Sequence, residues 1–127
     1  MSNSPIRVLV CGGRDFGIDP AERYFVQCTL DDFARDRDVV IIHGGAKGVD
    51  SVAGGWAKIK SWTVELYRAN WAKYGPRAGP IRNRQMLYEG KPDIVLAFPG
   101  GKGTAHMSQI AKSAGIDVIQ IEYTKGH

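Results

Sequence analysis

Hydrophobic residues gather in five short runs of five or six residues, separated by longer polar segments. Four of the runs are rich in Val and Ile, which is typical of strands buried on both faces of a parallel sheet. The run that begins at Thr63 alternates more between apolar and polar residues, so we expect it at an edge of the sheet. The predicted strands span residues 6–11, 39–43, 63–67, 93–98 and 117–121.

The segments between these runs have the features of helices. In the first segment, apolar residues recur at helical spacing behind Asp19-Pro20, a pair typical of a helix start. The predicted helices span residues 20–37, 50–60, 80–89 and 104–114. Strands that alternate with helices predict parallel pairing and right-handed crossovers. We therefore expect one α/β domain over residues 1–127, Rossmann-like, with a mostly parallel five-stranded sheet flanked by helices.

Composition is that of an ordinary globular protein. Of the 127 residues, 43% are hydrophobic and 24% are charged, which excludes a chain that is disordered throughout. No apolar run approaches the roughly 20 residues that span a bilayer, and the first ten residues lack the features of a signal peptide. These observations predict a cytoplasmic protein without a membrane partner.

Charge and cysteine content limit the ligands to be considered. The net charge of +4 favours an anionic ligand, but the charges are interspersed, so nucleic-acid binding is permitted rather than indicated. Cys11 and Cys28 lie in apolar surroundings without a CxxC pattern, which predicts reduced, buried thiols. No His/Cys cluster has the spacing of metal ligands, which leaves only Mg²⁺ held through a bound phosphate.

Three glycine-rich turns follow the first, second and fourth predicted strands. Ligands of open α/β sheets bind at the carboxyl ends of strands, so we expect these turns along one ligand-binding edge. Glycine lets a phosphate oxygen approach the main chain, and the free N–H groups of a helix start bind anions. The predicted phosphate-binding residues are Gly12, Gly13, Arg14, Asp15, Gly44, Gly45, Ala46, Lys47, Gly48, Pro99, Gly100, Gly101, Lys102, Gly103 and Thr104.

Neither common nucleotide motif is present. The stretch GGAKGVD lacks both the spacing and the final Lys-Ser/Thr of a P-loop. The stretch CGGRDFG is not GxGxxG, and no acidic residue closes the second strand to hold a ribose hydroxyl. Ordinary ATPase and dehydrogenase functions are therefore disfavoured.

Two sets of motifs together resemble a known superfamily. The stretch IRNRQMLYEGKPDIVLAFPGGKGT resembles the core of the SLOG superfamily, which contains the Lonely Guy phosphoribohydrolases, lysine-decarboxylase-like proteins and the DNA-processing protein DprA. In Lonely Guy enzymes an arginine stands fifteen positions before PGGxGT, with an aspartate between them, and Arg84 and Asp93 match this pattern. The stretches VCGGRDF and HGGAKGVDSVAGGWA are similar to the small YspA-related branch, so the resemblance extends from about Ile6 to Ile121.

This resemblance implies a domain that binds a nucleotide or nucleotide-derived ligand and forms a homodimer or higher oligomer. It also implies that Arg84 contacts a phosphate or ribose oxygen and is a catalytic candidate. In the enzymatic branch the motif continues as PGGxGTxxE, and its glutamate takes part in cleaving an N-glycosidic bond. Met107 holds that position here, and methionine can neither stabilise an oxocarbenium-like centre nor position water.

Other residues could supply the missing chemistry. Asp50 is the second catalytic candidate, although it can equally cap the second helix, and Asp15 can equally bond its own backbone in a turn. His43 is expected to be structural. His106 is expected at the surface, because it faces about 100° away from Met107 on a helix.

The connection between residues 68 and 80 is long for a compact domain, and long loops are often functional. It carries Trp71 and Tyr74, which can stack on a base or cover the site as a lid. Packing of Trp71 onto the sheet or into a dimer contact is equally compatible with the sequence.

Three functions remain open. The first is a binding module, a sensor or sequestering domain for a nucleotide or ADP-ribose-like molecule, which the absent glutamate favours. The second is a phosphoribohydrolase-type enzyme that cleaves nucleoside monophosphates, which Arg84 and PGGKGT favour. The third is DNA binding of the DprA kind, favoured only by the basic isoelectric point of about 9.2.

Overall fold

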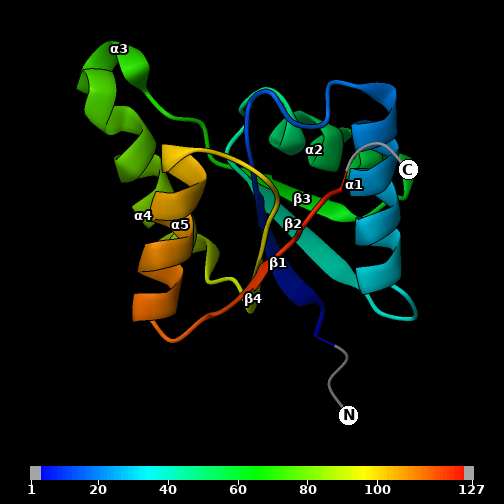
Figure 1. Cartoon of the computed structure of the whole chain (residues 1–127). Coiled ribbons are helices and arrows are strands. Elements are labelled where there is room, and N and C mark those ends of the chain that lie inside the picture. Colours follow the sequence, from blue (N-terminus) through cyan, green and yellow to red (C-terminus); the bar gives the residue numbers. More distant parts are fainter. Residues whose placement is uncertain (1–3, 125–127) are drawn as a thin grey trace.

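The computed structural model describes residues 4–124 and contains one sheet of five parallel strands, in the order β3-β2-β1-β4-β5 (Figure 1). The strands are β1 (Ile6–Cys11), β2 (Val39–His43), β3 (Thr63–Leu66), β4 (Ile94–Ala97) and β5 (Asp117–Gln120). The predicted fold class is confirmed, and β3 lies at an edge, as its alternating pattern predicts. Residues 1–3 and 125–127 of the predicted domain lie outside the described range.

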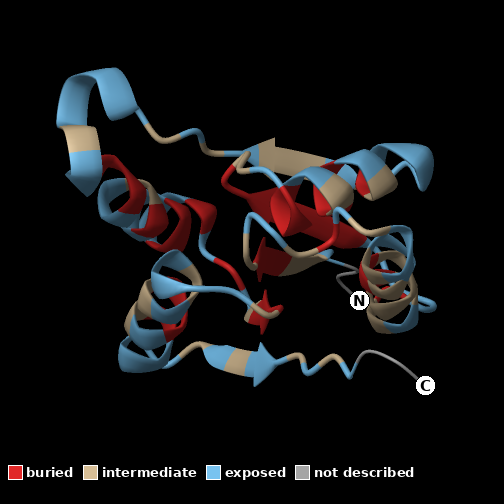
Figure 2. Ribbon diagram, turned by 45° about the horizontal axis from the view of Figure 1, so that its top comes forward, coloured by how far each residue is buried: buried red, intermediate tan, exposed pale blue. Residues whose placement is uncertain are grey.

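Helices cover both faces of the sheet (Figure 1). They are α1 (Pro20–Phe33), α2 (Val49–Ile59), α4 (Ala78–Gly90) and α5 (Lys102–Ser113), with the short α3 (Trp71–Tyr74) and a 3₁₀ turn, η1 (Gly75–Arg77), in the connection after β3. Along β1, Val8 and Val10 pack with α1 and α2, whereas Leu9 and Cys11 pack with α4 and α5. The central strands are buried on both faces (Figure 2), which explains why their sequences are almost wholly apolar.

Three helix ends differ from the predicted ones by two residues or more. α1 ends at Phe33 instead of Arg37, and Asp36 in the following turn has a φ of 57°, which a helix cannot accommodate. α4 and α5 each begin two residues earlier than predicted. Pro80 is therefore the third residue of α4, where its missing N–H costs nothing because first-turn N–H groups have no acceptor within the helix.

The order of the strands places a switch point between β1 and β4. The chain builds outward from β1 through β2 to β3, then crosses back and continues on the other side with β4 and β5. The loops after β1 and β4 therefore diverge from neighbouring strand ends, which is where ligands bind in such sheets. Within residues 4–124, no helix is both long and apolar enough to cross a membrane.

Gly48, just before α2, is the residue whose backbone is least tolerant of a side chain. Its φ is 77° and its ψ is −127°. A Cβ there would overlap the carbonyl oxygen of Gly13 and would lie 2.7 Å from each of the carbonyl oxygens of Arg14 and Phe16. The first glycine-rich loop can therefore pack on the start of α2 only because residue 48 is glycine.

We predict that Gly48→Ala lowers the free energy of unfolding by more than about 2 kcal/mol, because both the backbone strain and the overlap act on the folded state. The matched control is Gly55→Ala in the same helix, where an added Cβ meets nothing within 4 Å. This control should gain about 0.5–1 kcal/mol from helix propensity. Urea denaturation of both variants measures the difference, and equal effects would contradict the packing described here.

Candidate functional site

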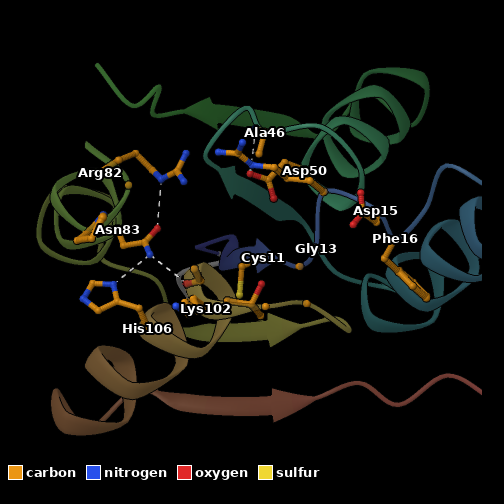
Figure 3. A pocket seen from close by; sticks show the side chains of 18 of the residues that line it. Cys11, Gly13, Asp15, Phe16, Ala46, Asp50, Arg82, Asn83, Lys102 and His106 are labelled. Atoms are coloured by element: carbon orange, nitrogen blue, oxygen red, sulfur yellow. Dashed lines mark hydrogen bonds between the residues drawn. The ribbon is translucent and has the colours of Figure 1, made fainter. Parts of the chain in front are cut away.

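A cleft of about 870 Å³ opens at the switch point, beside the carboxyl ends of β1 and β4 (Figure 3). Its walls come from the loops after these two strands, the facing sides of α4 and α5, Ala46 and Asp50 after β2, and Trp71 in α3. The predicted site residues that line it are Gly12, Gly13, Arg14, Asp15, Ala46, Asp50, Trp71, Pro99, Gly100, Gly101, Lys102, Gly103 and Thr104.

The loop after β4 presents the start of α5 to this cleft. Gly101 stands at the N-cap position and supplies no capping side chain. The first backbone N–H of the helix with an acceptor is that of Ala105, which donates to the Gly101 carbonyl at 3.0 Å. The N–H groups of Lys102, Gly103 and Thr104 find no protein acceptor among the described residues, and this end of a helix carries a partial positive charge. Backbone geometry and dipole together form an anion-binding arrangement.

The start of α2, in contrast, does not open into the cleft. The Gly13 carbonyl oxygen accepts a hydrogen bond from the Val49 N–H at 3.4 Å, and the first loop covers this helix end. Of the second glycine-rich turn, only Ala46 and Asp50 reach the cleft, whereas Gly44, Gly45, Lys47 and Gly48 do not line it. The sequence shows that this turn leads into a helix, but it does not show that the first glycine-rich loop covers the start of that helix.

Asp50 braces the second turn instead of capping α2. Its Oδ2 accepts hydrogen bonds from the N–H groups of Gly44 at 3.1 Å and Ala46 at 3.2 Å. The residue is only 6% exposed. Burial raises the pKa of Asp50, while the hydrogen bond from Ala46 and the nearby Arg82 guanidinium act in the opposite direction. The cleft therefore contains a deeply placed carboxyl group with restricted access to water.

On α4 the polar side chains that reach the cleft are those of Arg82 and Asn83, not Arg84 (Figure 3). The Arg82 Nη1 donates to the Gly44 carbonyl at 2.7 Å, and its Nε donates to the Asn83 Oδ1 at 3.1 Å. Arg84 is exposed and lies in a separate groove with Tyr88. Residues two apart on a helix point about 200° apart, so only one of the two arginines can face the sheet edge. The structure does not bring Arg84 to the site predicted for it.

Asn83 joins α4 to the first turn of α5. Its Nδ2 donates to the Gly103 carbonyl at 3.2 Å and lies 3.1 Å from the His106 Nδ1. His106 lines the cleft and is only partly exposed, which differs from the surface position expected for it. Burial lowers the pKa of His106, and the positive charge of Arg84 lowers it further. The neutral imidazole can therefore serve as a hydrogen-bonding partner at the cleft wall.

Met107 faces away from the cleft. It is fully buried in the core between α5 and the sheet, in the same cluster as Met86 and Leu87. Adjacent residues on a helix differ in direction by about 100°, so His106 can face the cleft while Met107 cannot. The position of the glutamate in the enzymatic motif is thus a core position in this chain.

Trp71 and Arg14 approach each other across the mouth of the cleft. The Arg14 guanidinium carbon lies 5.5 Å from the centre of the Trp71 ring. Trp71 is 48% exposed, and the outer edge of its indole faces Gly79 of α4. Tyr74 does not line the cleft. Trp71 therefore stands at a position where a planar ligand group can stack on it, and it does not pack onto the sheet.

The remaining wall residues are apolar or small, so the sequence did not single them out as ligand contacts, although Cys11 and Phe16 fall within the stretch VCGGRDF. They include Phe16, Pro76, Gly79, Pro80, Met86 and Cys11. Both described cysteines are free thiols, as predicted, although Cys28 is only partly buried. Burial raises the pKa of Cys11 to about 12, so this group is an un-ionised thiol at neutral pH and a poor nucleophile.

The charges of the lining favour an anion without excluding other polar groups. Three cationic side chains, Arg14, Arg82 and Lys102, line the cleft together with two carboxylates, Asp15 and Asp50. Across residues 4–124 no group of three or more His, Cys, Asp or Glu side chains is arranged to hold a metal ion.

An all-parallel sheet in this order, with a glycine-lined cleft at its switch point, defines a Rossmann-like α/β protein. The sequence model of the YspA, cpYpsA-related SLOG family matches residues 6–74, and the chain belongs to this family. The matched segment runs from β1 to α3 and includes the first two glycine-rich turns. The chain is also similar to the Gene 61 protein of Mycobacterium phage D29, with 42% identity over 92 residues that cover 64% of this chain and 70% of that protein.

His43, at the end of β2, gives a prediction about pH. It is 7% exposed, and its Nδ1 accepts the Gly45 N–H at 3.1 Å, in agreement with the structural role expected from the sequence. Burial, and then the charges of Arg68 and Arg82, lower the pKa of His43 to about 4. As the pH falls, the unfolded chain therefore takes up a proton on this residue at a higher pH than the folded protein does. The stability that His43 provides should be complete above about pH 6.5 and lost progressively down to about pH 4.

Chemical denaturation at a series of pH values, on the wild type and on His43→Asn, checks this expectation. The asparagine oxygen keeps an acceptor for the Gly45 N–H but cannot be protonated, so the variant should be less stable at pH 7 and less sensitive to pH between 6.5 and 4. Asp50, whose raised pKa acts in the opposite direction, is present in both proteins. Equal losses of stability in the two proteins would show that His43 is not the titrating group.

Proposed function

We propose that the protein binds a nucleotide or nucleotide-derived ligand in this cleft and acts as a sensor or sequestering module. The observation that carries the proposal is the uncapped start of α5, whose N–H groups at Lys102, Gly103 and Thr104 open into a cleft that also holds Arg14 and Arg82. The volume of about 870 Å³ falls in the range of roughly 300–1,000 Å³ typical of small-molecule sites. Membership of the SLOG family is consistent with a nucleotide-related ligand.

The phosphate group of the ligand is assigned to the loop from Pro99 to Thr104. Backbone N–H groups supply directed donors, and the Thr104 hydroxyl and the Lys102 ammonium can add to them. This loop can approach an anion closely because Gly100, Gly101 and Gly103 have no side chains. Mg²⁺, if the ligand requires it, would be held through that phosphate.

The base is assigned to the mouth of the cleft. Trp71 presents an exposed ring there, and stacking of a base on an aromatic side chain contributes roughly 1–3 kcal/mol. Arg14 already lies over the same ring, so the ligand would displace the guanidinium or stack on the opposite face. Both arrangements keep the arginine close to an anionic ligand.

Hydrolysis of an N-glycosidic bond is the second candidate, and Asp50 is the observation that favours it. This carboxyl group lines the cleft and its pKa is raised by burial, as is common for catalytic acids and bases. Neither Arg84 nor residue 107 of the enzymatic motif lines the cleft, and this favours a binding role.

The paired arginines of α4 provide the first test of the binding proposal. Arg82→Gln should weaken the binding of nucleoside monophosphates about tenfold or more, because a cationic donor is removed from the cleft. Arg84→Gln makes the same change in charge on the same helix but outside the cleft, and it should alter the dissociation constant less than about twofold. Isothermal titration with AMP, GMP, CMP and UMP, with and without Mg²⁺, measures both effects. A larger loss in Arg84→Gln than in Arg82→Gln would contradict the proposed site.

The fate of the ligand separates the two candidate functions. Each nucleotide is incubated with the protein and analysed by chromatography for free base and ribose 5-phosphate. We expect the ligand to be recovered intact. Release of free base above the rate of a heat-inactivated control would establish the hydrolase instead, and loss of that activity in Asp50→Asn would assign the carboxylate.

Pairing of two copies, which the family resemblance implies, stays a prediction. The exposed apolar side chains of Ile81 and Tyr88 on α4 are compatible with such a contact. Size-exclusion chromatography with light scattering measures the molar mass.

DNA binding of the DprA kind also stays a separate prediction, for which a salt-dependent affinity for DNA would be the evidence.

A further inference from the structure

The carboxyl group of Asp50 uses only one of its two oxygens within the protein. Oδ2 accepts both hydrogen bonds from the second turn, whereas Oδ1 has no hydrogen-bond partner among residues 4–124. Among residues 4–124, every side-chain oxygen or nitrogen that is completely shielded from solvent has a hydrogen-bond partner. Oδ1 has no such partner, so it is not completely shielded and retains access to the cleft that Asp50 lines. Figure 3 shows this carboxyl group turned toward the interior of the cleft.

Arg82 does not neutralise this oxygen by direct pairing. Its guanidinium is engaged with the Gly44 carbonyl and the Asn83 side chain, and no ion pair within 4.0 Å joins it to Asp50. Bracing of the second turn requires only Oδ2. Asp50 is only 6% exposed, and buried polar atoms normally have a hydrogen-bond partner. Its Oδ1 is therefore an acceptor for a donor that the protein itself does not supply.

A carboxylate in a cleft built for an anion indicates a ligand that carries donors as well as phosphate. Asp50 lies deep in the cleft, whereas Trp71 is half exposed at its mouth. If the phosphate lies on α5 and the base on Trp71, then the part of a nucleotide that lies between them is the ribose. Its hydroxyl groups are the donors closest to the phosphate.

We propose that Asp50 is a specificity-determining residue whose Oδ1 accepts a hydrogen bond from a ribose hydroxyl, so that the cleft selects ribonucleotides over deoxyribonucleotides. This inference rests on the proposed function and deepens it. A hydrogen bond to a charged group corresponds to roughly a 10- to 100-fold difference in affinity. The charge of the same carboxylate works against phosphate binding, so the discrimination arises from the sugar and not from the phosphate.

The experiment compares sugars within one protein. The tightest binder among AMP, GMP, CMP and UMP is titrated against its 2′-deoxy, 3′-deoxy and 2′,3′-dideoxy counterparts by calorimetry. The wild type should bind the ribonucleotide at least about tenfold more tightly than the dideoxy compound. In Asp50→Asn the amide nitrogen replaces the accepting oxygen, so this ratio should fall below about threefold while binding of the dideoxy compound stays the same or improves.

Asp117→Asn is the matched control, since Asp117 is exposed at the start of β5 and does not line the cleft. It should keep the wild-type ratio between the ribonucleotide and the dideoxy compound.

If Asp50→Asn does not fold, as judged by circular dichroism, the wild type alone decides the question. A 2′- or 3′-fluoro analogue, which cannot donate, should bind as weakly as the matching deoxy compound, and an amino analogue, which can donate, should recover affinity.

The outcomes separate this inference from the proposed function. Binding of ribo and dideoxy compounds with equal affinity would overturn the role of Asp50 and leave nucleotide binding intact. An Asp50→Asn variant that keeps the sugar preference but loses a preference among the bases would overturn it as well, since Asp50 would then contact a base amino group. Absence of binding by every nucleotide would overturn the proposed function itself.

Discussion

The site depends on the way β1 and β4 stay joined beyond their last residues. The Phe98 N–H donates to the Cys11 carbonyl at 2.9 Å, and the Gly13 N–H donates to the Pro99 carbonyl at 2.8 Å. These two bonds carry the strand pairing into the loops, which fixes where α5 begins relative to the first loop. The approach is so close that a Cβ on Gly100 would lie 2.7 Å from the Gly13 nitrogen. The start of α5 faces the cleft because this pairing holds it there.

The contacts around the second turn add to this frame. Asp50 holds the turn by two backbone N–H groups, and Arg82 holds it from the opposite side through the Gly44 carbonyl. Asn83 then connects Arg82 to the first turn of α5. One chain of polar contacts thus runs from the second turn through α4 to the anion-binding end of α5. Displacement of one member would therefore disturb the contacts of its neighbours along this chain.

The fold could be predicted from the sequence because the apolar runs are short, regular and strongly β-branched. Strand positions agreed to within about a residue at most ends, whereas helix ends depended on turns such as that at Asp36, whose left-handed backbone leaves no clear sequence pattern. The site was harder to predict. The sequence predicts ligand loops at the carboxyl ends of β1, β2 and β4; the cleft lies beside β1 and β4, and after β2 only Ala46 and Asp50 line it. Arg84 is favoured on spacing along the chain, but spacing does not specify which face of α4 a residue occupies. Likewise, the sequence could not show that the first loop covers the start of α2 or that His106 turns inward.

The burial of Met107 determines what a charged side chain at this position would do. In a Met107→Glu variant the side chain would enter the core between α5 and the sheet, where an unpaired carboxylate costs several kcal/mol. A charged residue at position 107 would therefore act first on the stability of the protein, through the packing of α5 on the sheet.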